Sequence, residues 1–188
     1  MNLRKSILII ASLAFAFAMS TVQAASVSLT PALSTGNVGG SATLELFMDF
    51  TGDPTLGGGI DLALSGPISW GGFTPSAYFS ALDEAFSDHG FVAADADYEI
   101  HFGSFGGLDG NHKLGDITVD LLGIGTGTIA MAINNLAGSF LSASTFSTQE
   151  VILSGAEIQV NTVPVPAAVW LFGSALGLLG GFRRRFQK

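Results

Sequence analysis

Apolar and polar residues alternate along most of the middle of the chain. Between Ala42 and Phe50 every second residue is apolar, and the positions between them are polar except for Phe47. Successive side chains of an extended strand point to opposite faces, so this alternation predicts a strand with one buried face. Similar patterns predict further strands at 27–30, 60–65, 98–102, 117–121, 128–133, 151–153 and 156–160.

Glycine-rich stretches separate these segments, and they predict turns and surface connections. They are Gly36-Asn37, Gly57 to Gly59, Gly103 to Gly107 and Gly123 to Gly127. About eight short strands with no alternation of strand and helix favour a single antiparallel β-sandwich, a mainly β fold of the immunoglobulin-like kind.

One segment, from Thr74 to Gly90, departs from the two-residue period. Thr74 is a candidate N-cap, Pro75 suits the first helical position, and a glycine follows at the far end. The apolar residues between them recur at helical spacing: Tyr78, Ala81, Leu82, Ala85 and Phe86. The segment therefore predicts one short amphipathic helix lying across a connection of the sandwich.

Residues 1–24 have the features of a secretory signal peptide. Arg4 and Lys5 supply positive charge, Ile7 to Met19 form an apolar run too short to span a membrane, and small residues surround Ala24. We therefore expect export by the general secretion machinery and cleavage between Ala24 and Ala25. An exported domain would then occupy residues 25–162.

The last segment, 163–188, has the composition of a membrane anchor. A Pro164-Val165-Pro166 motif follows Val163, residues 165–182 carry no charge, and Arg183, Arg184 and Arg185 follow. Eighteen uncharged residues are at the short end of what crosses a bilayer as a helix, and the arginines are expected to stay on the cytoplasmic side. The chain before Pro164 would then lie outside the inner membrane.

This order of proline motif, apolar helix and basic cluster resembles the PEP-CTERM sorting tail of exported proteins in Gram-negative bacteria that make exopolysaccharide. The resemblance implies recognition by the membrane protease exosortase, removal of the tail, and delivery to the cell surface or the exopolysaccharide matrix. Valine replaces the glutamate of the family's Pro-Glu-Pro, which leaves open where the chain is cut. The alternative is a permanent single-span anchor.

Charge is distributed unevenly along the chain. All 15 acidic residues lie between Glu45 and Glu157, and Lys113 is the only lysine or arginine between residues 25 and 162. A domain this acidic repels nucleic acid and anionic lipid headgroups, so we expect no nucleic-acid partner. Because the chain has no cysteine, the exported domain must be stabilised by its hydrophobic core without disulfides.

Two stretches of the middle region resemble cohesin-like modules. Asn37, Val38, Gly39 and the following residues 41–44 are similar to the opening of such modules, and residues 113–133 are similar to their late strands. The resemblance implies a sandwich that mediates contact with protein or glycan. Fold alone does not decide between these two roles.

No motif for catalysis is present. His89, His101 and His112 fit none of the compact zinc-ligand spacings, and neither Gly-x-Ser-x-Gly nor a phosphate-binding glycine loop occurs. We therefore expect a protein that is not an enzyme, with a structural or adhesive role. The alternative from another class is a carbohydrate-binding receptor or a small glycan-active enzyme.

Two sets of residues are candidates for ligand contact. Asp95, Asp97 and Glu99 share one face if their segment is extended, and with Asp83, Glu84 and Asp88 they offer oxygens for a structural Ca²⁺. Asp109-Gly110-Asn111 is a second candidate, which resembles part of a calcium loop. Solvated surface charge is the simpler account. Trp70 and Tyr78, near Phe73 and Phe79, would suit stacking against a sugar ring, although packing in the core explains such aromatics equally well. We expect no other cofactor.

Overall fold

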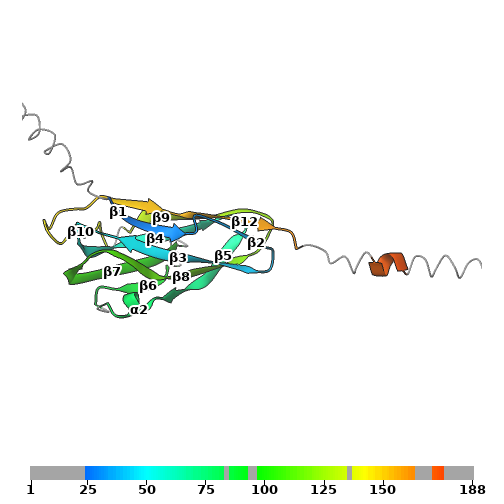
Figure 1. Ribbon diagram of the computed structural model, residues 1–188, viewed down its shortest axis with the longest axis horizontal. Helices are drawn as coiled ribbons and strands as arrows, with labels where there is room; N and C mark the ends of the chain where they lie inside the picture. Colours follow the sequence, from blue (N-terminus) through cyan, green and yellow to red (C-terminus); the bar gives the residue numbers. More distant parts are fainter. Residues whose placement is uncertain (1–23, 83–84, 93–96, 135–136, 164–170, 176–188) are drawn as a thin grey trace, which may run out of the picture.

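A computed structural model describes residues 24–82, 85–92, 97–134, 137–163 and 171–175. The chain from Ala25 to Asn161 forms two β-sheets that pack face to face (Figure 1). This is the mainly β sandwich that the alternating pattern predicts.

The first sheet has five strands in the order β11-β1-β3-β8-β5. Its strands are β1 (Ala25–Thr30), β3 (Ser41–Asp49), β5 (Ile68–Pro75), β8 (Asn111–Leu121) and β11 (Val151–Ser154).

The second sheet has seven strands, with the path β2-β12-β9-β4-β7-β6 and β10 paired to β4. Its strands are β2 (Leu33–Asn37), β4 (Thr55–Ser65), β6 (Asp88–Val92), β7 (Asp97–Leu108), β9 (Gly125–Ile133), β10 (Leu141–Ser142) and β12 (Ala156–Asn161).

The core lies between the sheets and follows the predicted alternation. On β3 the residues Ala42, Leu44, Leu46, Met48 and Phe50 beyond its end are buried, while Phe47 is half-buried on the outer face. Alternate residues of β4, β7, β8 and β12 complete the core: Ile60, Leu62, Ile100, Phe102, Ile117, Val119, Ile158 and Val160. Burial of these apolar side chains is the main stabilising contribution in a domain without disulfides.

The prediction of a purely antiparallel sandwich is wrong at one edge of each sheet. β1 pairs with β11, and β2 with β12, in parallel. The chain crosses from the five-stranded to the seven-stranded sheet after Thr30, and again at Gly155 between β11 and β12. The first two strands therefore pair in parallel with the last two, one pair in each sheet, and the domain's two ends lie at opposite ends of the sandwich (Figure 1).

The predicted strands are all present, but β2, β5, β6 and β10 were not predicted. All four glycine-rich stretches expected as turns lie wholly or partly inside strands: Gly36-Asn37 at the end of β2, Gly57 to Gly59 in β4, Gly103 to Gly107 in β7, and Gly125 and Gly127 in β9. At Gly127 an added Cβ would lie 2.6 Å from the Ile68 side chain, so close packing between the sheets requires a residue without a side chain there.

The predicted helix over 74–90 is wrong in extent. Thr74 and Pro75 belong to β5, and the helix, α2, covers only Ala77–Ser80 with Ser76 as its N-cap. The Phe79 N–H donates to Ser76 Oγ (3.1 Å), and residues 88–92 pair with β7 as strand β6. Strand pairing on both sides limits the helix, and a second short helical stretch covers 171–175.

Candidate functional site

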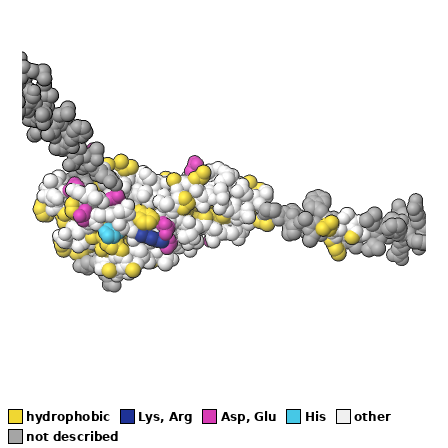
Figure 2. Space-filling view, in the orientation of Figure 1, with side chains coloured by type: hydrophobic (Ala, Val, Ile, Leu, Met, Phe, Trp, Pro, Cys, Tyr) yellow, Lys and Arg dark blue, Asp and Glu magenta, His cyan; other side chains and the backbone are white. Residues whose placement is uncertain are grey.

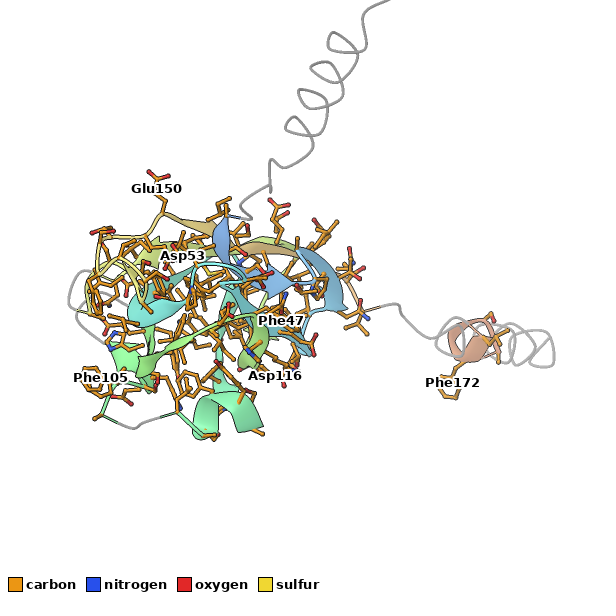
Figure 3. All side chains as sticks on the ribbon, turned by 60° about the vertical axis from the view of Figure 1, so that its left-hand side comes forward. Phe47, Asp53, Phe105, Asp116, Glu150 and Phe172 are labelled. Atoms are coloured by element: carbon orange, nitrogen blue, oxygen red, sulfur yellow. The ribbon has the colours of Figure 1, made fainter. Side chains whose placement is uncertain are left out.

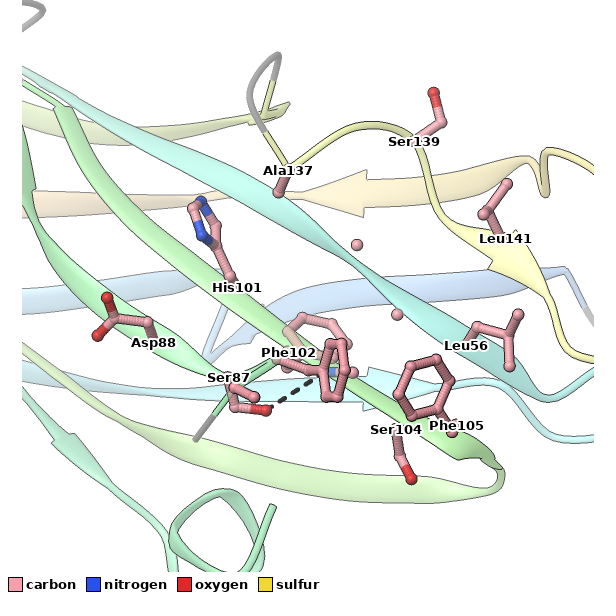
Figure 4. A pocket seen from close by; sticks show the side chains of 15 residues that line it. Leu56, Ser87, Asp88, His101, Phe102, Ser104, Phe105, Ala137, Ser139 and Leu141 are labelled. Carbon is pink, nitrogen blue, oxygen red and sulfur yellow. Dashed lines mark hydrogen bonds between the residues drawn. The ribbon is translucent and has the colours of Figure 1, made fainter. Parts of the chain in front are cut away.

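An open groove crosses the outer face of the seven-stranded sheet where β4 and β7 lie side by side (Figure 4). Its volume is about 560 Å³. One wall comes from residues 85–88 before and within β6, and the other from residues 137–141 around β10. The lining residues are Leu56, Gly57, Gly58, Ala85, Phe86, Ser87, Asp88, His101, Phe102, Gly103, Ser104, Phe105, Ala137, Ser139 and Leu141.

Glycines form the floor of the groove because the two strands approach too closely for side chains. Gly57 and Gly103 are partners across β4 and β7. A Cβ on Gly103 would lie 2.8 Å from the Leu56 carbonyl oxygen, and one on Gly57 would collide with the Phe102 carbonyl. The pairing is irregular between Thr55 and Gly57, as expected for a β-bulge. The result is a stretch of bare backbone open to a ligand.

An exposed pair of aromatic rings borders the groove. Phe86 and Phe105 meet edge to face, with ring centroids 4.5 Å apart. Phe105 is 83% exposed and Phe86 39% exposed, and Figure 3 shows Phe105 at the rim of the sandwich. Large exposed rings beside a cavity provide apolar contact area that a partner can bury.

The other end of the groove is polar and acidic. In the strand register, His101 of β7 lies opposite Asp88 of β6 on one side and Gly59 of β4 on the other. Two residues earlier on β7, Glu99 lies opposite Asp61 of β4. His101 Nε2 is 3.4 Å from Glu99 Oε2 but forms no well-oriented hydrogen bond within the described part of the chain. Nearby, the Gly103 N–H donates to Ser87 Oγ (3.3 Å), which joins the strand β7 to the first wall (Figure 4).

Asn134 stabilises the second wall. It is buried, its side-chain amide donates to Asp61 Oδ1 (2.5 Å), and its Oδ1 accepts from the Ala137 N–H (2.7 Å). The Asn134 N–H donates in turn to the Gly59 carbonyl (2.9 Å). The wall is therefore fixed to β4 rather than free to close over the groove.

Trp70 and Tyr78, the candidates for sugar contact, lie outside the groove. Trp70 on β5 packs against Tyr98 with centroids 5.3 Å apart, and Tyr78 on α2 stacks against His112 at 4.0 Å. Phe73 and Phe79 contact each other and His89, so they fill the opening between the sheets beside α2. Both candidates are half-buried, which leaves each only part of a ring face for a ligand.

Burial also affects the ionisable groups of this aromatic cluster. Burial raises the pKa of Tyr78, and burial followed by the negative charge of Asp88 raises the pKa of Tyr98. Tyr98 Oη and His89 Nδ1 are hydrogen-bonded at 2.8 Å. The three histidines lie on β6, β7 and β8, each with different neighbours.

The candidate calcium ligands are only partly described. Asp83, Glu84 and Asp95 lie outside the described residues, Asp97 opens β7, and Glu99 faces His101. Asp109 Oδ1 accepts from the N–H groups of Gly110 (2.8 Å) and Gly52 (3.4 Å). Within the described ranges no three His, Asp or Glu side chains are grouped closely enough to hold a metal ion. Calcium binding stays a prediction.

The sorting residues are also mostly beyond the described part of the chain. This applies to Pro164, Val165, Pro166, Arg183, Arg184 and Arg185, while Val163 is exposed after β12. The expected cleavage point between Ala24 and Ala25 coincides with the start of β1. No helix among the described residues is long and apolar enough to span a membrane, and the expected span 165–182 is described only at 171–175.

Comparison with known proteins shows a cohesin-like fold. No protein-family model and no curated protein sequence matches the chain. Among solved structures, the seventh ScaB type I cohesin from Pseudobacteroides cellulosolvens is similar over 76% of this chain and 96% of its own, with TM-score 0.60 and 10% identity.

Two further cohesins extend this result. The Coh-OlpC–Doc435 cohesin–dockerin complex from Clostridium thermocellum matches 77% of this chain and 98% of its own (TM-score 0.58, 12% identity). A non-cellulosomal cohesin from the archaeon Archaeoglobus fulgidus matches 74% and 93% (TM-score 0.54, 7% identity). At these identities the likeness establishes the fold.

Proposed function

We propose that this protein is a non-enzymatic docking module of the cell surface, which binds a segment of another protein in the groove over β4 and β7. Its role is structural or adhesive. The cohesin-like fold supports this proposal, because a module of that fold is joined to a dockerin in the Clostridium thermocellum complex.

The observation that carries the proposal is the exposed Phe86–Phe105 pair beside a floor of bare backbone. Binding energy at protein interfaces is concentrated in a few aromatic side chains that become buried in the complex. No side chain stands above the glycine floor, so a partner segment can approach the backbone closely there. Asp88 in the lining, and Glu99 and Asp61 in the adjoining row of the sheet, favour a partner segment with basic residues at this end.

Export and sorting place the module outside the inner membrane. The signal peptide would direct it to the general secretion machinery, and the 165–182 helix would hold it in the membrane until exosortase removes the tail. The module would then reach the cell surface or the exopolysaccharide matrix, where other surface proteins or exopolysaccharide are its partners. Both steps rest on the sequence of the two terminal segments.

Photo-crosslinking in the producing cells tests the docking groove. A benzophenone amino acid replaces Phe105 in one variant and Phe146 in another. Phe146 is a matched control because it is 75% exposed and does not line the groove. We expect position 105 to give a discrete adduct with a surface protein and position 146 to give none, and Phe86→Ala to reduce the adduct at position 105.

Two outcomes would contradict this assignment. Equal adducts at both positions would indicate nonspecific contact. Attachment of polysaccharide instead of protein would favour the carbohydrate-binding receptor, and a glycan array comparing wild type with Trp70→Ala would then show whether Trp70 or the groove holds the sugar.

The mass of the protein recovered from cells tests the sorting proposal. Cleavage at or near Pro164–Pro166 removes the apolar helix and the arginines together, so we expect the recovered protein to lack the mass of that segment. The same protein from cells without exosortase should keep it. A full-length C-terminus in both strains would identify a permanent anchor.

A further inference from the structure

The end of the sandwich from which the C-terminal segment leaves is a single rigid surface, which we call the exit end. It consists of Ser65 at the end of β4, the connections at residues 38–40, 66–67 and 122–124, and residues 161–163. The Val38 N–H donates to the Asn161 carbonyl (3.0 Å), the Gly39 N–H to the Leu121 carbonyl (2.8 Å), and the Leu122 N–H to the Pro67 carbonyl (2.9 Å). These bonds fix the turns relative to one another and to the departing chain.

The exit end carries no ionisable side chain, although the chain has 15 acidic residues. Its most prominent side chains are apolar: Leu122 is 63% exposed, Ile124 66% and Val163 59%. In Figure 2 the visible face of this end has only white and yellow atoms. Isolated exposed apolar residues are common, but two at the tip of one turn, next to the departing chain, form a small apolar surface on a strongly acidic domain.

Residues 161–165 join the sandwich to the uncharged run, and we call them the tether. This short tether keeps the exit end close to whatever the tail inserts into. Gly125 pairs with Val160, so Ile124 lies about one strand spacing, roughly 5 Å, from the end of β12. From Asn161 to Val165, the first residue of the uncharged run, a fully extended chain reaches at most about 14 Å. The headgroup layer on one side of a bilayer is roughly 5 to 7 Å thick.

We propose that the exit end rests on the lipid bilayer while the chain is anchored, with Leu122 and Ile124 entering the headgroup layer. This inference rests on the anchoring helix of the proposed function. A bilayer fits better than another acidic protein because the contact needs apolar burial and no counter-charge. The short tether also holds the exit end next to the membrane that the tail enters. Approach by the exit end also keeps most carboxylates of the domain in water, and the nearest of them is the exposed Asp120, two residues before Leu122.

This contact would orient the docking groove. Ser65, the last residue of β4, lies at the exit end, and Leu56 lines the groove nine residues earlier on the same strand. Nine residues of strand span roughly 30 Å. The groove would therefore face away from the membrane, toward partners outside the cell, instead of being covered by lipid.

Depth-dependent quenching of a fluorescent label tests the inference. Because the chain has no cysteine, each introduced cysteine is a unique attachment site. The tail-bearing protein is reconstituted into phosphatidylcholine vesicles containing lipid with a nitroxide quencher, with bimane at Ile124→Cys, Thr145→Cys or Gly173→Cys. Thr145 is an exposed control at the groove end, and Gly173 reports insertion of the tail.

We expect quenching at positions 124 and 173 but not at 145, and we expect Leu122→Asp to abolish quenching at 124 while leaving 173 unchanged. Quenching at 173 alone would overturn the inference and keep the anchor. Loss at both positions would overturn the anchoring and the inference with it. Disulfide-linked dimers of Ile124→Cys, formed without quenching by lipid, would assign the exit end to a second copy and also overturn the proposal.

Discussion

At the scale of single residues, Phe140 connects the groove to the core. It is fully buried, and its ring centroid lies 5.4 Å from those of Phe50 and Phe102. A Cβ on Gly58 would lie only 2.8 Å from this ring, so the absence of a side chain in β4 makes room for Phe140. The segment that forms the second wall is thus held down by one aromatic residue that packs against both sheets.

Phe140→Ala should strongly destabilise the protein. The substitution removes a buried ring and leaves a cavity between Phe50 and Phe102, and such changes cost about 3 to 5 kcal/mol. Denaturant-induced unfolding measures the loss, and Phe146→Ala is the matched control because its ring is exposed and its removal should change the free energy of unfolding by less than about 0.5 kcal/mol. Similar effects of the two substitutions would show that Phe140 is not part of the core.

At the scale of elements, strands with one buried and one solvated face were predictable. β3 and β8 alternate almost without interruption, so their burial follows from the two-residue period alone. β5 and β6 were missed because their positions depend on tertiary pairing: Pro75 faces Gly115 of β8, and His89 faces Ile100 of β7. Neither contact has a local signal in the sequence.

The groove was missed because its main signal was interpreted as turns. Glycines normally interrupt strands, so Gly103 to Gly107 predicted a loop. Phe105, which lies among them, was therefore not predicted as a contact residue. In the structure the glycines of β4 and β7 face one another, and the phenylalanine is left exposed beside them. A large aromatic residue flanked by glycines was the available signal.

The Ser76 cap decides whether α2 stays docked. Ser76 Oγ accepts from the Phe79 N–H (3.1 Å) and donates to the Lys113 carbonyl (2.6 Å), so one hydroxyl both starts the helix and joins it to β8. We expect Ser76→Ala to lower the free energy of unfolding by about 1 to 2 kcal/mol. In the same unfolding experiment Ser80→Ala, at an exposed position of α2, should have a much smaller effect. Equal losses would place the stabilisation in the helix as a whole.

At the scale of the whole molecule, the acidic charge is the dominant feature of the exported domain. Lys113, its only lysine, lies on the outer face of the five-stranded sheet between Glu45 (Nζ–Oε1, 2.6 Å) and Asp116 (Nζ–Oδ1, 2.8 Å). In Figure 2 dark blue lysine atoms lie beside magenta acidic atoms on the visible face. The hydrogen bonds that this lysine donates to Asp116 and, second, to Glu45 raise its pKa, so it stays charged well above neutral pH. Because Lys113 is the only lysine or arginine between residues 25 and 162, the carboxylates of this region far outnumber its basic side chains.

This imbalance predicts that salt stabilises the protein. Mutual repulsion of the carboxylates favours the expanded unfolded chain, and it weakens as the screening length falls from roughly 30 Å at 0.01 M salt to roughly 3 Å at 1 M. We therefore expect the Tm to rise with NaCl concentration at pH 7. Lys113→Met should have a lower Tm than wild type at low salt, because Glu45 and Asp116 then repel each other unopposed, and the difference should shrink at 1 M NaCl. A Tm difference between Lys113→Met and wild type that did not depend on salt would contradict this. The lysine would then act through packing of its aliphatic stem against its neighbours. The acidic surface would be tolerated because its charges are too far apart to interact through water.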